Sequence, residues 1–219
     1  MAEYITTFSG INFYPLDPDP EGILIEDVAH SLARLCRANG HYDGFYSVAA
    51  HCINCYEEAC ARSESVRVRL ACLLHDAAEA YISDIPRPVK MDLDGIDVIE
   101  NRLLSMIYTR FLGSDLTEYE AQTVKVIDDA MLYYEFYEFS GIRLIEEFPY
   151  VATTPLFYDD TIRRVEEQYL EIFHALDPSK EAPKTVTKLR LKGAPEEERT
   201  PLRLKEEPAD TTEDASATV

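Results

Sequence analysis

The sequence lacks a long hydrophobic segment. No uninterrupted apolar run among its 219 residues approaches the roughly 18 residues that a membrane-spanning helix needs. Residues 1–7 also lack the basic segment and the following apolar run that mark a secretory signal. We therefore expect a soluble protein of the cytoplasm that does not associate with membranes.

Basic residues are scarce. The chain has 21 lysines and arginines against 41 aspartates and glutamates, which gives a formal charge of −20. Such a surplus of negative charge repels nucleic-acid backbones and anionic lipid surfaces at long range. We therefore expect no polymeric DNA or RNA partner, whereas a small anionic ligand could bind where a few bases and a metal ion reverse the potential locally.

Cysteines are few, and their number is odd. An odd count without a secretory signal argues against a disulfide framework. Cys52 and Cys55 form a C-x-x-C pattern directly after His51, which is compatible with a zinc site or a redox pair. Because no second C-x-x-C accompanies the first, we interpret both as small buried residues and keep metal ligation as the alternative. The five cysteines are Cys36, Cys52, Cys55, Cys60 and Cys72.

The sequence also lacks internal repeats and any sustained alternation of polar and apolar residues, which leaves helical periodicity as the main structural signal. The predicted fold is all-α, with about six helices in a single domain over residues 1–177. From residue 178 to 219 there is no aromatic residue, and this composition predicts a disordered tail. The predicted helices cover residues 25–38, 45–61, 65–81, 95–112, 117–139 and 158–176.

One segment, residues 68–80, changes abruptly from apolar to charged at His75 and Asp76. Both fall in the middle of the predicted helix 65–81, whose other face is apolar. Burying an imidazole beside a carboxylate costs several kcal/mol unless something compensates them, and a divalent cation does so directly. The alternative is an ion pair exposed on the helix surface.

Two other helices offer further ligands for such a cation. His51 lies on the preceding predicted helix, and Asp128 follows an apolar pair inside the long helix 117–139. Imidazole and carboxylate groups that converge from separate elements suit a borderline or hard divalent ion. Asp129 adjoins Asp128, so the sequence leaves the register of this last ligand open.

The order His51, then His75 and Asp76, then Asp128 resembles the HD-domain metal-dependent phosphohydrolases. The resemblance is to the branch of bacterial 5′-deoxynucleotidases and phage-type deoxynucleotide phosphohydrolases. Departures occur at Ala50 and Cys52, where related sequences commonly carry Gln or Glu and Ser. The matching blocks are residues 25–32, 37–41, 45–51, 74–80, 84–90 and 125–128.

The resemblance implies a role for each matched residue. Glu79 would orient or deprotonate the attacking water. Asp84 would contact the sugar and favour deoxyribose. The alternatives are a solvated surface charge for Glu79 and a cap of the proline-rich loop for Asp84. The four residues His51, His75, Asp76 and Asp128 would hold one divalent ion, which could be Co, Mn, Zn or Mg.

Basic and imidazole groups near this set are candidates for phosphate binding. Arg37 and His41 lie at the end of the first predicted helix, where they could meet a phosphate. Lys90 could reach the phosphate or merely keep its loop solvated. His30, on an apolar helix face, is interpreted as a hydrogen-bonded structural histidine.

The sequence thus favours an enzyme that hydrolyses a phosphate ester or anhydride of a deoxynucleotide. The substrate could be a monophosphate or a triphosphate such as dATP. The alternative is a nucleotide-sensing domain that keeps the fold without turnover. The family resemblance also implies a homo-oligomer.

Overall fold

The computed structural model describes residues 3–155, 157 and 161–176. The predicted tail, residues 178–219, and the expected start of the last helix at residues 158–160 lie outside these residues. The chain divides into residues 1–186 and 187–219, and every described residue belongs to the first part. None of the helices in the described ranges has both the length and the apolar character needed to cross a bilayer.

The all-α prediction is confirmed. The longer elements are α1 (Ile25–Leu32), α2 (Val48–Ala61), α3 (Val66–Leu74), α6 (Ile96–Leu112), α7 (Glu118–Ser140) and α8 (Ile162–Leu176). Two one-turn helices, α4 (Glu79–Ile82) and α5 (Arg87–Lys90), and two 3₁₀ turns, η1 (Pro20–Gly22) and η2 (Arg37–Gly40), complete the helical part. A short antiparallel pair, β1 (Ile5–Thr6) and β2 (Asn12–Phe13), precedes them.

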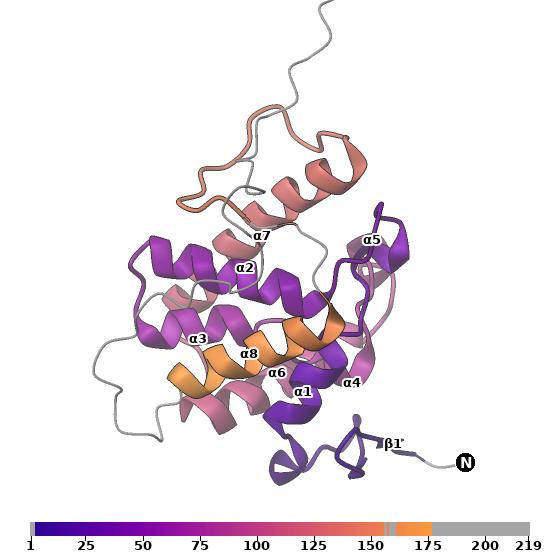
Figure 1. Ribbon diagram of the computed structural model, residues 1–219. Coiled ribbons are helices and arrows are strands. Elements are labelled where there is room, and N and C mark those ends of the chain that lie inside the picture. Colours follow the sequence, from indigo (N-terminus) through magenta and orange to yellow (C-terminus); the bar gives the residue numbers. More distant parts are fainter. Residues whose placement is uncertain (1–2, 156, 158–160, 177–219) are drawn as a thin grey trace, which may run out of the picture. The chain divides into compact units, whose positions relative to one another are not determined.

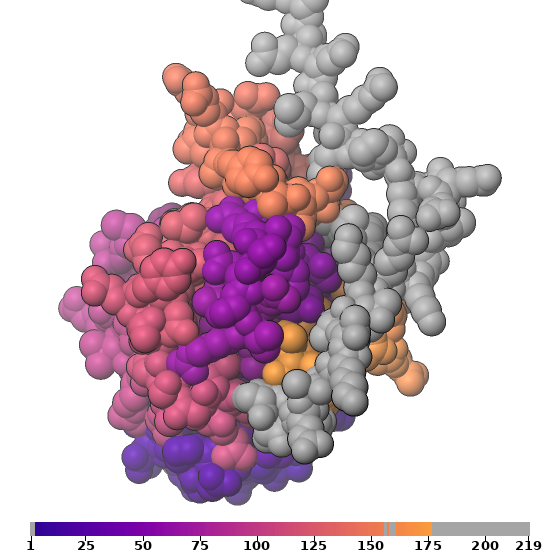
Figure 2. All heavy atoms as spheres, turned by 90° about the vertical axis from the view of Figure 1, so that its left-hand side faces the viewer, coloured from indigo at the N-terminus to yellow at the C-terminus, as the bar shows by residue number. Residues whose placement is uncertain are grey.

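The core is built around α2 and α3, which pack closely against each other. Helices α7 and α8 both contact this pair, and α1 packs on α8 (Figure 1). Small buried residues such as Ala49, Cys52 and Ala59 allow α2 to approach its neighbours. In the space-filling view, the purple segments that include α2 lie between pink segments and the orange α8 (Figure 2). His51 is therefore carried by a helix with neighbours on several sides.

Hydroxyl side chains begin the helices that carry the candidate ligands. Ser47 and Ser65 accept hydrogen bonds from backbone N–H groups in the first turns of α2 and α3, as expected of N-caps. Thr117 and Glu120 form a reciprocal capping box at the start of α7. Ser65 thus begins α3 at the start of the predicted helix 65–81.

The first two predicted helices are shorter than expected. The backbone N–H of Arg37 donates to the carbonyl of Tyr46, and that of Val48 donates to the carbonyl of Leu35. These tertiary hydrogen bonds replace helical ones, so α1 ends at Leu32 and α2 begins only at Val48. Arg37 consequently lies in η2, beyond the end of α1.

The prediction of one continuous helix over residues 65–81 is wrong. Helix α3 ends at Leu74, and α4 begins at Glu79. Between them the hydrogen bonds connect residues three apart, such as the 2.9 Å bond from the Ala77 N–H to the Leu74 carbonyl. His75 and Asp76 therefore lie at the exit of α3 and not in the middle of a helix.

Candidate metal centre

The four residues predicted to bind a metal come together at one point. His51 comes from α2, His75 and Asp76 from the turn after α3, and Asp128 from α7. The Nε2 atom of His51 lies 3.1 Å from Nε2 of His75 and 3.1 Å from Oδ1 of Asp128. Oδ2 of Asp76 lies 3.7 Å from Nε2 of His51 and 3.4 Å from Nε2 of His75.

These separations fit a common metal ion. Ligand atoms that lie 2.0–2.2 Å from one ion are about 2.8 to 3.6 Å apart in tetrahedral or octahedral arrangements. The distances between the imidazole nitrogens and the carboxylate oxygens run from 3.1 to 3.7 Å. Two imidazoles and two carboxylates also match the donor preference of borderline and hard divalent ions. The buried groups could therefore hold a metal ion, whose identity the geometry leaves open.

Of the two adjacent aspartates, Asp128 lies beside the histidines. Asp129 turns away from the histidines and pairs with Arg87 at 3.0 Å and with Lys125 at 2.7 Å. Only Asp128 of this neighbouring pair has a carboxylate oxygen within hydrogen-bond distance of His51. The structure thus answers a question that the sequence left open.

A buried carboxylate contacts His51 at Nδ1, the ring nitrogen opposite the candidate metal position. The side chain of Glu135 is fully buried, and its Oε1 lies 2.6 Å from Nδ1 of His51. Tyr46 donates its hydroxyl to the same oxygen at 2.9 Å. A carboxylate on Nδ1 fixes the proton there and leaves Nε2 free to bind a cation.

Sequence analysis missed Glu135. It lies seven residues after Asp128, which is about two helical turns, so both project from one side of α7. Val124, Ile127 and Met131 are buried on that helix. A glutamate on the buried face of an amphipathic helix was the signal that could have pointed to it.

Arg37 connects Glu135 to Asp76. Its Nε lies 3.3 Å from Oε2 of Glu135, and its Nη1 lies 3.2 Å from Oδ2 of Asp76. Burial lowers the pKa of Arg37, but the carboxylates of Glu135 and Asp76 raise it well above the ordinary value. The predicted phosphate-binding residue is therefore also a buried counter-ion within the centre.

The two histidines favour their charged forms when only protein groups surround them. Burial lowers the pKa of His51, yet Glu135 and Asp128 raise it well above 6.5. Burial also lowers the pKa of His75, but the carboxylate of Asp76 is the main cause that raises this pKa well above 6.5. A cation must displace these protons, because imidazole binds a metal only in its neutral form.

Glu79 is buried, in contrast to the solvated alternative. Glu79 is the first residue of α4, and its Oε2 has no hydrogen-bond partner among the described residues. Burial raises the pKa of Glu79 well above its ordinary value, and the nearby Asp76 and Asp84 raise it further. A carboxyl group in such a setting accepts a proton far more readily than one in water.

Asp84 lies half-buried beyond α4. Burial raises its pKa, Arg37 opposes this effect, and Asp76 reinforces it. The preceding Ser83 has a left-handed backbone with φ of 74°, which turns the chain sharply at this point. Among the described residues the Asp84 carboxylate forms no hydrogen bond, so the proposed cap of the proline-rich loop is not formed.

Three other residues that the sequence singled out lie apart from the four ligands. His41 is exposed after η2. Lys90 forms an ion pair with Glu100. His30 is the structural histidine expected from the sequence, because its Nδ1 lies 3.1 Å from Glu166 and its ring stacks on Phe8.

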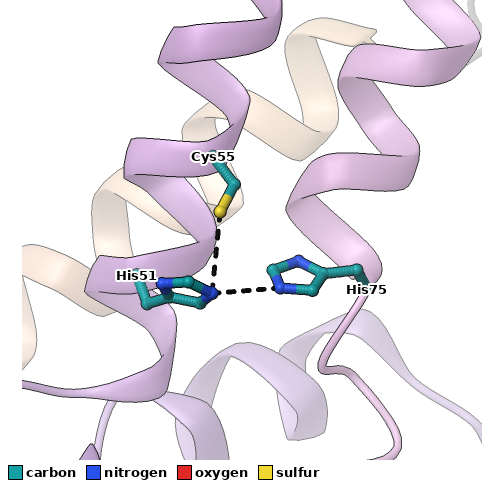
Figure 3. A group of neighbouring side chains, drawn as sticks. All are labelled: His51, Cys55 and His75. Carbon is teal, nitrogen blue, oxygen red and sulfur yellow. Dashed lines mark hydrogen bonds between the residues drawn. The ribbon is translucent and has the colours of Figure 1, made fainter. Parts of the chain in front are cut away.

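Cys52 and Cys55 are buried, as the sequence predicted, and both lie beside the histidine pair. The Sγ atom of Cys55 lies 3.6 Å from Nε2 of His51 (Figure 3). Cys52 forms a second close group with His75 and Asp76. Potential sulfur ligands therefore border the histidine pair, and metal ligation stays open for this C-x-x-C pattern.

Comparison with known proteins identifies relatives without a described activity. The chain is 36% identical over 108 residues to the uncharacterized protein YfdR of Escherichia coli, which is 49% of this chain and 58% of YfdR. It is 42% identical over 109 residues to the uncharacterized protein RCAP_rcc00048 of Rhodobacter capsulatus, covering 47% and 55% of the two chains. The matches span little more than half the length of these relatives, and no family model matches.

Proposed function

We propose that this protein is a metal-dependent phosphohydrolase of the HD-domain type, acting on deoxynucleotide phosphates. The observation that carries the proposal is the convergence of His51, His75 and Asp128 within 3.1 to 3.7 Å, with Asp76 beside them. Together with the order of these residues in the sequence, this favours a hydrolytic metal centre over an ordinary buried ion-pair network.

The donor set and its surroundings suit a divalent cation. His51, His75, Asp76 and Asp128 would hold the ion, and Glu135 would keep the Nε2 of His51 available for it. A divalent ion in such a site lowers the pKa of a bound water and offsets the negative charge of a phosphate.

Glu79 is the proposed proton acceptor. It is buried next to Asp76, and its raised pKa favours uptake of a proton from an attacking water. One of its oxygens has no partner among the described residues, so it is available for this task. The same carboxyl group could return the proton to the leaving oxygen.

Arg37 and Asp84 are the proposed contacts to substrate. Arg37 uses Nε and Nη1 for its two carboxylate partners, which leaves further guanidinium N–H groups for a phosphate. Asp84 has no hydrogen-bond partner among the described residues and could accept one from a sugar hydroxyl. We propose a smaller part for His41 and Lys90, since one is exposed and the other is paired with Glu100.

A product screen tests this function directly. Purified protein is incubated with deoxynucleoside mono-, di- and triphosphates in the presence of Mn, Co, Zn or Mg, and the products are separated by chromatography. Release of inorganic phosphate from a monophosphate indicates a 5′-deoxynucleotidase, whereas release of triphosphate indicates a triphosphohydrolase. Binding of a nucleotide without turnover under every metal condition would contradict the enzyme and favour the sensing domain. Light scattering during purification tests the proposed homo-oligomer.

A further inference from the structure

The side chains of His51 and His75 lie close to the thiol of Cys55 as well as to the carboxylates of Asp76 and Asp128. His51 and Cys55 project from the same helix, one turn apart, toward His75 at the end of the neighbouring helix (Figure 3). The ligand atoms of these three residues all lie within 4.8 Å of one another. His51 and Cys55 are almost completely shielded from solvent, at 0% and 1% exposure.

The distances match those expected around a thiophilic ion. With bonds of about 2.0–2.1 Å to nitrogen and about 2.3 Å to sulfur at a tetrahedral angle, a nitrogen and a sulfur ligand lie about 3.6 Å apart, and two nitrogens about 3.4 Å apart. The Sγ of Cys55 lies 3.6 Å from Nε2 of His51, and the two Nε2 atoms are 3.1 Å apart. Small side-chain adjustments would complete the arrangement.

We propose that His51, His75 and Cys55 form a second binding mode of this centre, selective for soft and borderline divalent cations such as zinc or cadmium. The inference rests on the proposed metal site, because both modes use the same Nε2 atoms. Thiolate ligands favour soft cations, whereas the carboxylates of Asp76 and Asp128 favour hard ones such as manganese and magnesium. The sequence thus provides for two classes of metal at one pair of histidines.

The two modes exclude each other at full occupancy. Each imidazole nitrogen has one lone pair, so an ion on the thiol side competes with an ion on the carboxylate side. Binding at Cys55 replaces the S–H bond by a metal–sulfur bond and releases the proton to solvent. A soft cation should therefore displace manganese.

Cobalt titration gives a readout that is independent of hydrolysis. The reduced full-length protein is titrated with Co²⁺, bound metal is measured by equilibrium dialysis, and the near-ultraviolet sulfur-to-cobalt charge-transfer band is recorded. The wild type should bind cobalt and show this band. Cys55→Ser and Cys55→Ala should still bind cobalt through the carboxylate-side ligands but without the band.

Cys60 provides the matched control, since it lies on the same helix and is not part of either candidate ligand group. Cys60→Ala should keep the band unchanged. Loss of the band in Cys60→Ala as well would reveal non-specific thiol binding and overturn the inference. A band that survives in both Cys55 variants but disappears in Cys52→Ser would also overturn it, because the ligand would then be Cys52.

The outcomes separate this inference from the proposed function. Stoichiometric cobalt binding without a charge-transfer band in the wild type overturns the thiol mode and leaves the carboxylate-side centre in place. No cobalt binding at all overturns both. In a parallel titration, Cys55→Ser should weaken cadmium binding by at least about tenfold, the scale on which altered partners affect metal sites, and should leave manganese binding nearly unchanged. Equal weakening of both metals would contradict the assigned selectivity.

Discussion

The candidate metal centre has two different sides, a buried side around Glu135 and a second side formed by Glu79 and Asp84. On the buried side, Glu135 is held by His51, Tyr46 and Arg37 at distances from 2.6 to 3.3 Å. On the other side, Glu79 keeps an oxygen without a partner among the described residues, and Asp84 lies half-buried without a hydrogen bond there. Oε2 of Glu135 forms no hydrogen bond but is paired with Arg37, whereas Glu79 and Asp84 form neither a hydrogen bond nor an ion pair among the described residues. An unpartnered carboxylate costs free energy that substrate or water can recover. We infer that Glu135 positions the ligands and that Glu79 and Asp84, together with the remaining N–H groups of Arg37, meet the substrate.

The largest expected effect comes from removing a ligand. Asp128→Ala should abolish metal binding and reduce hydrolysis to background, because the two imidazoles then lose a carboxylate partner that lies 3.1 Å from His51. Metal content by atomic emission and phosphate release check this together. Asp129→Ala is the matched control and should lose only the surface pairs with Arg87 and Lys125. If Asp129→Ala loses the metal and Asp128→Ala keeps it, the assigned register is wrong.

Glu79→Gln tests the substrate side. It should lower turnover by about 10² to 10⁴-fold, the usual contribution of a positioned acid or base, with little change in metal content. Steady-state kinetics and metal analysis separate these effects. Glu26→Gln, an exposed change on α1, is the control for altered net charge. If Glu79→Gln keeps full activity, Glu79 is not the group that accepts the proton of the attacking water.

Glu135→Gln tests the buried side. It should weaken metal binding by about 10 to 100-fold, as expected when the outer partner of a ligating histidine is changed. Loss of the negative charge should also lower the pKa of His51, so that metal binding begins at a lower pH than in the wild type. If Glu135 has a purely structural role, the substitution would weaken metal binding without changing the pH at which binding begins. Glu138→Gln, on the same helix, should change neither property.

The stability of the protein should depend on pH in opposite ways with and without metal. In the metal-free protein the pKa values of His51 and His75 are raised above 6.5, so their protonation stabilises the fold below that pH. This contribution is lost as the pH rises through the folded-state values. Metal binding needs the neutral imidazoles, so the increase in Tm on adding manganese should grow as the pH is raised above 6.5. Differential scanning calorimetry with and without chelator measures it. A metal effect that shrinks with rising pH would contradict the assignment of these histidines as ligands.

Local patterns predicted the all-α fold and singled out the four candidate ligands, but they did not predict the interactions between distant segments. Helix α7, Glu118–Ser140, lies within one residue of the predicted range 117–139, because burial of one helix face is encoded within a few turns. The end of α1 depended on backbone hydrogen bonds to Tyr46 and Val48, which no local pattern reveals.

The same limit applies to the centre itself. The residue types and their order singled out four residues that the fold brings together, since buried imidazoles and carboxylates need a partner wherever the chain places them. The role of Glu135 depended on which residue of α7 faces α2, and the pairing of Lys90 depended on the approach of α6. These are tertiary contacts over tens of residues. Sequence patterns predicted which groups gather at the centre better than they predicted its supporting hydrogen bonds.

The smallest expected effect concerns Lys90, at the edge of the substrate side. Because Lys90 is paired with Glu100, removing its charge in Lys90→Ala should change KM for a deoxynucleotide by no more than about fivefold, which corresponds to about 1 kcal/mol, the upper end of the range for exposed pairs. Glu100→Ala should release the lysine and, if anything, lower KM, because the freed ammonium can turn toward the phosphate. The two variants thus predict opposite signs from one ion pair. A large increase in KM for Lys90→Ala would show that the lysine leaves Glu100 when substrate binds, and it would extend the substrate side of the centre to α5.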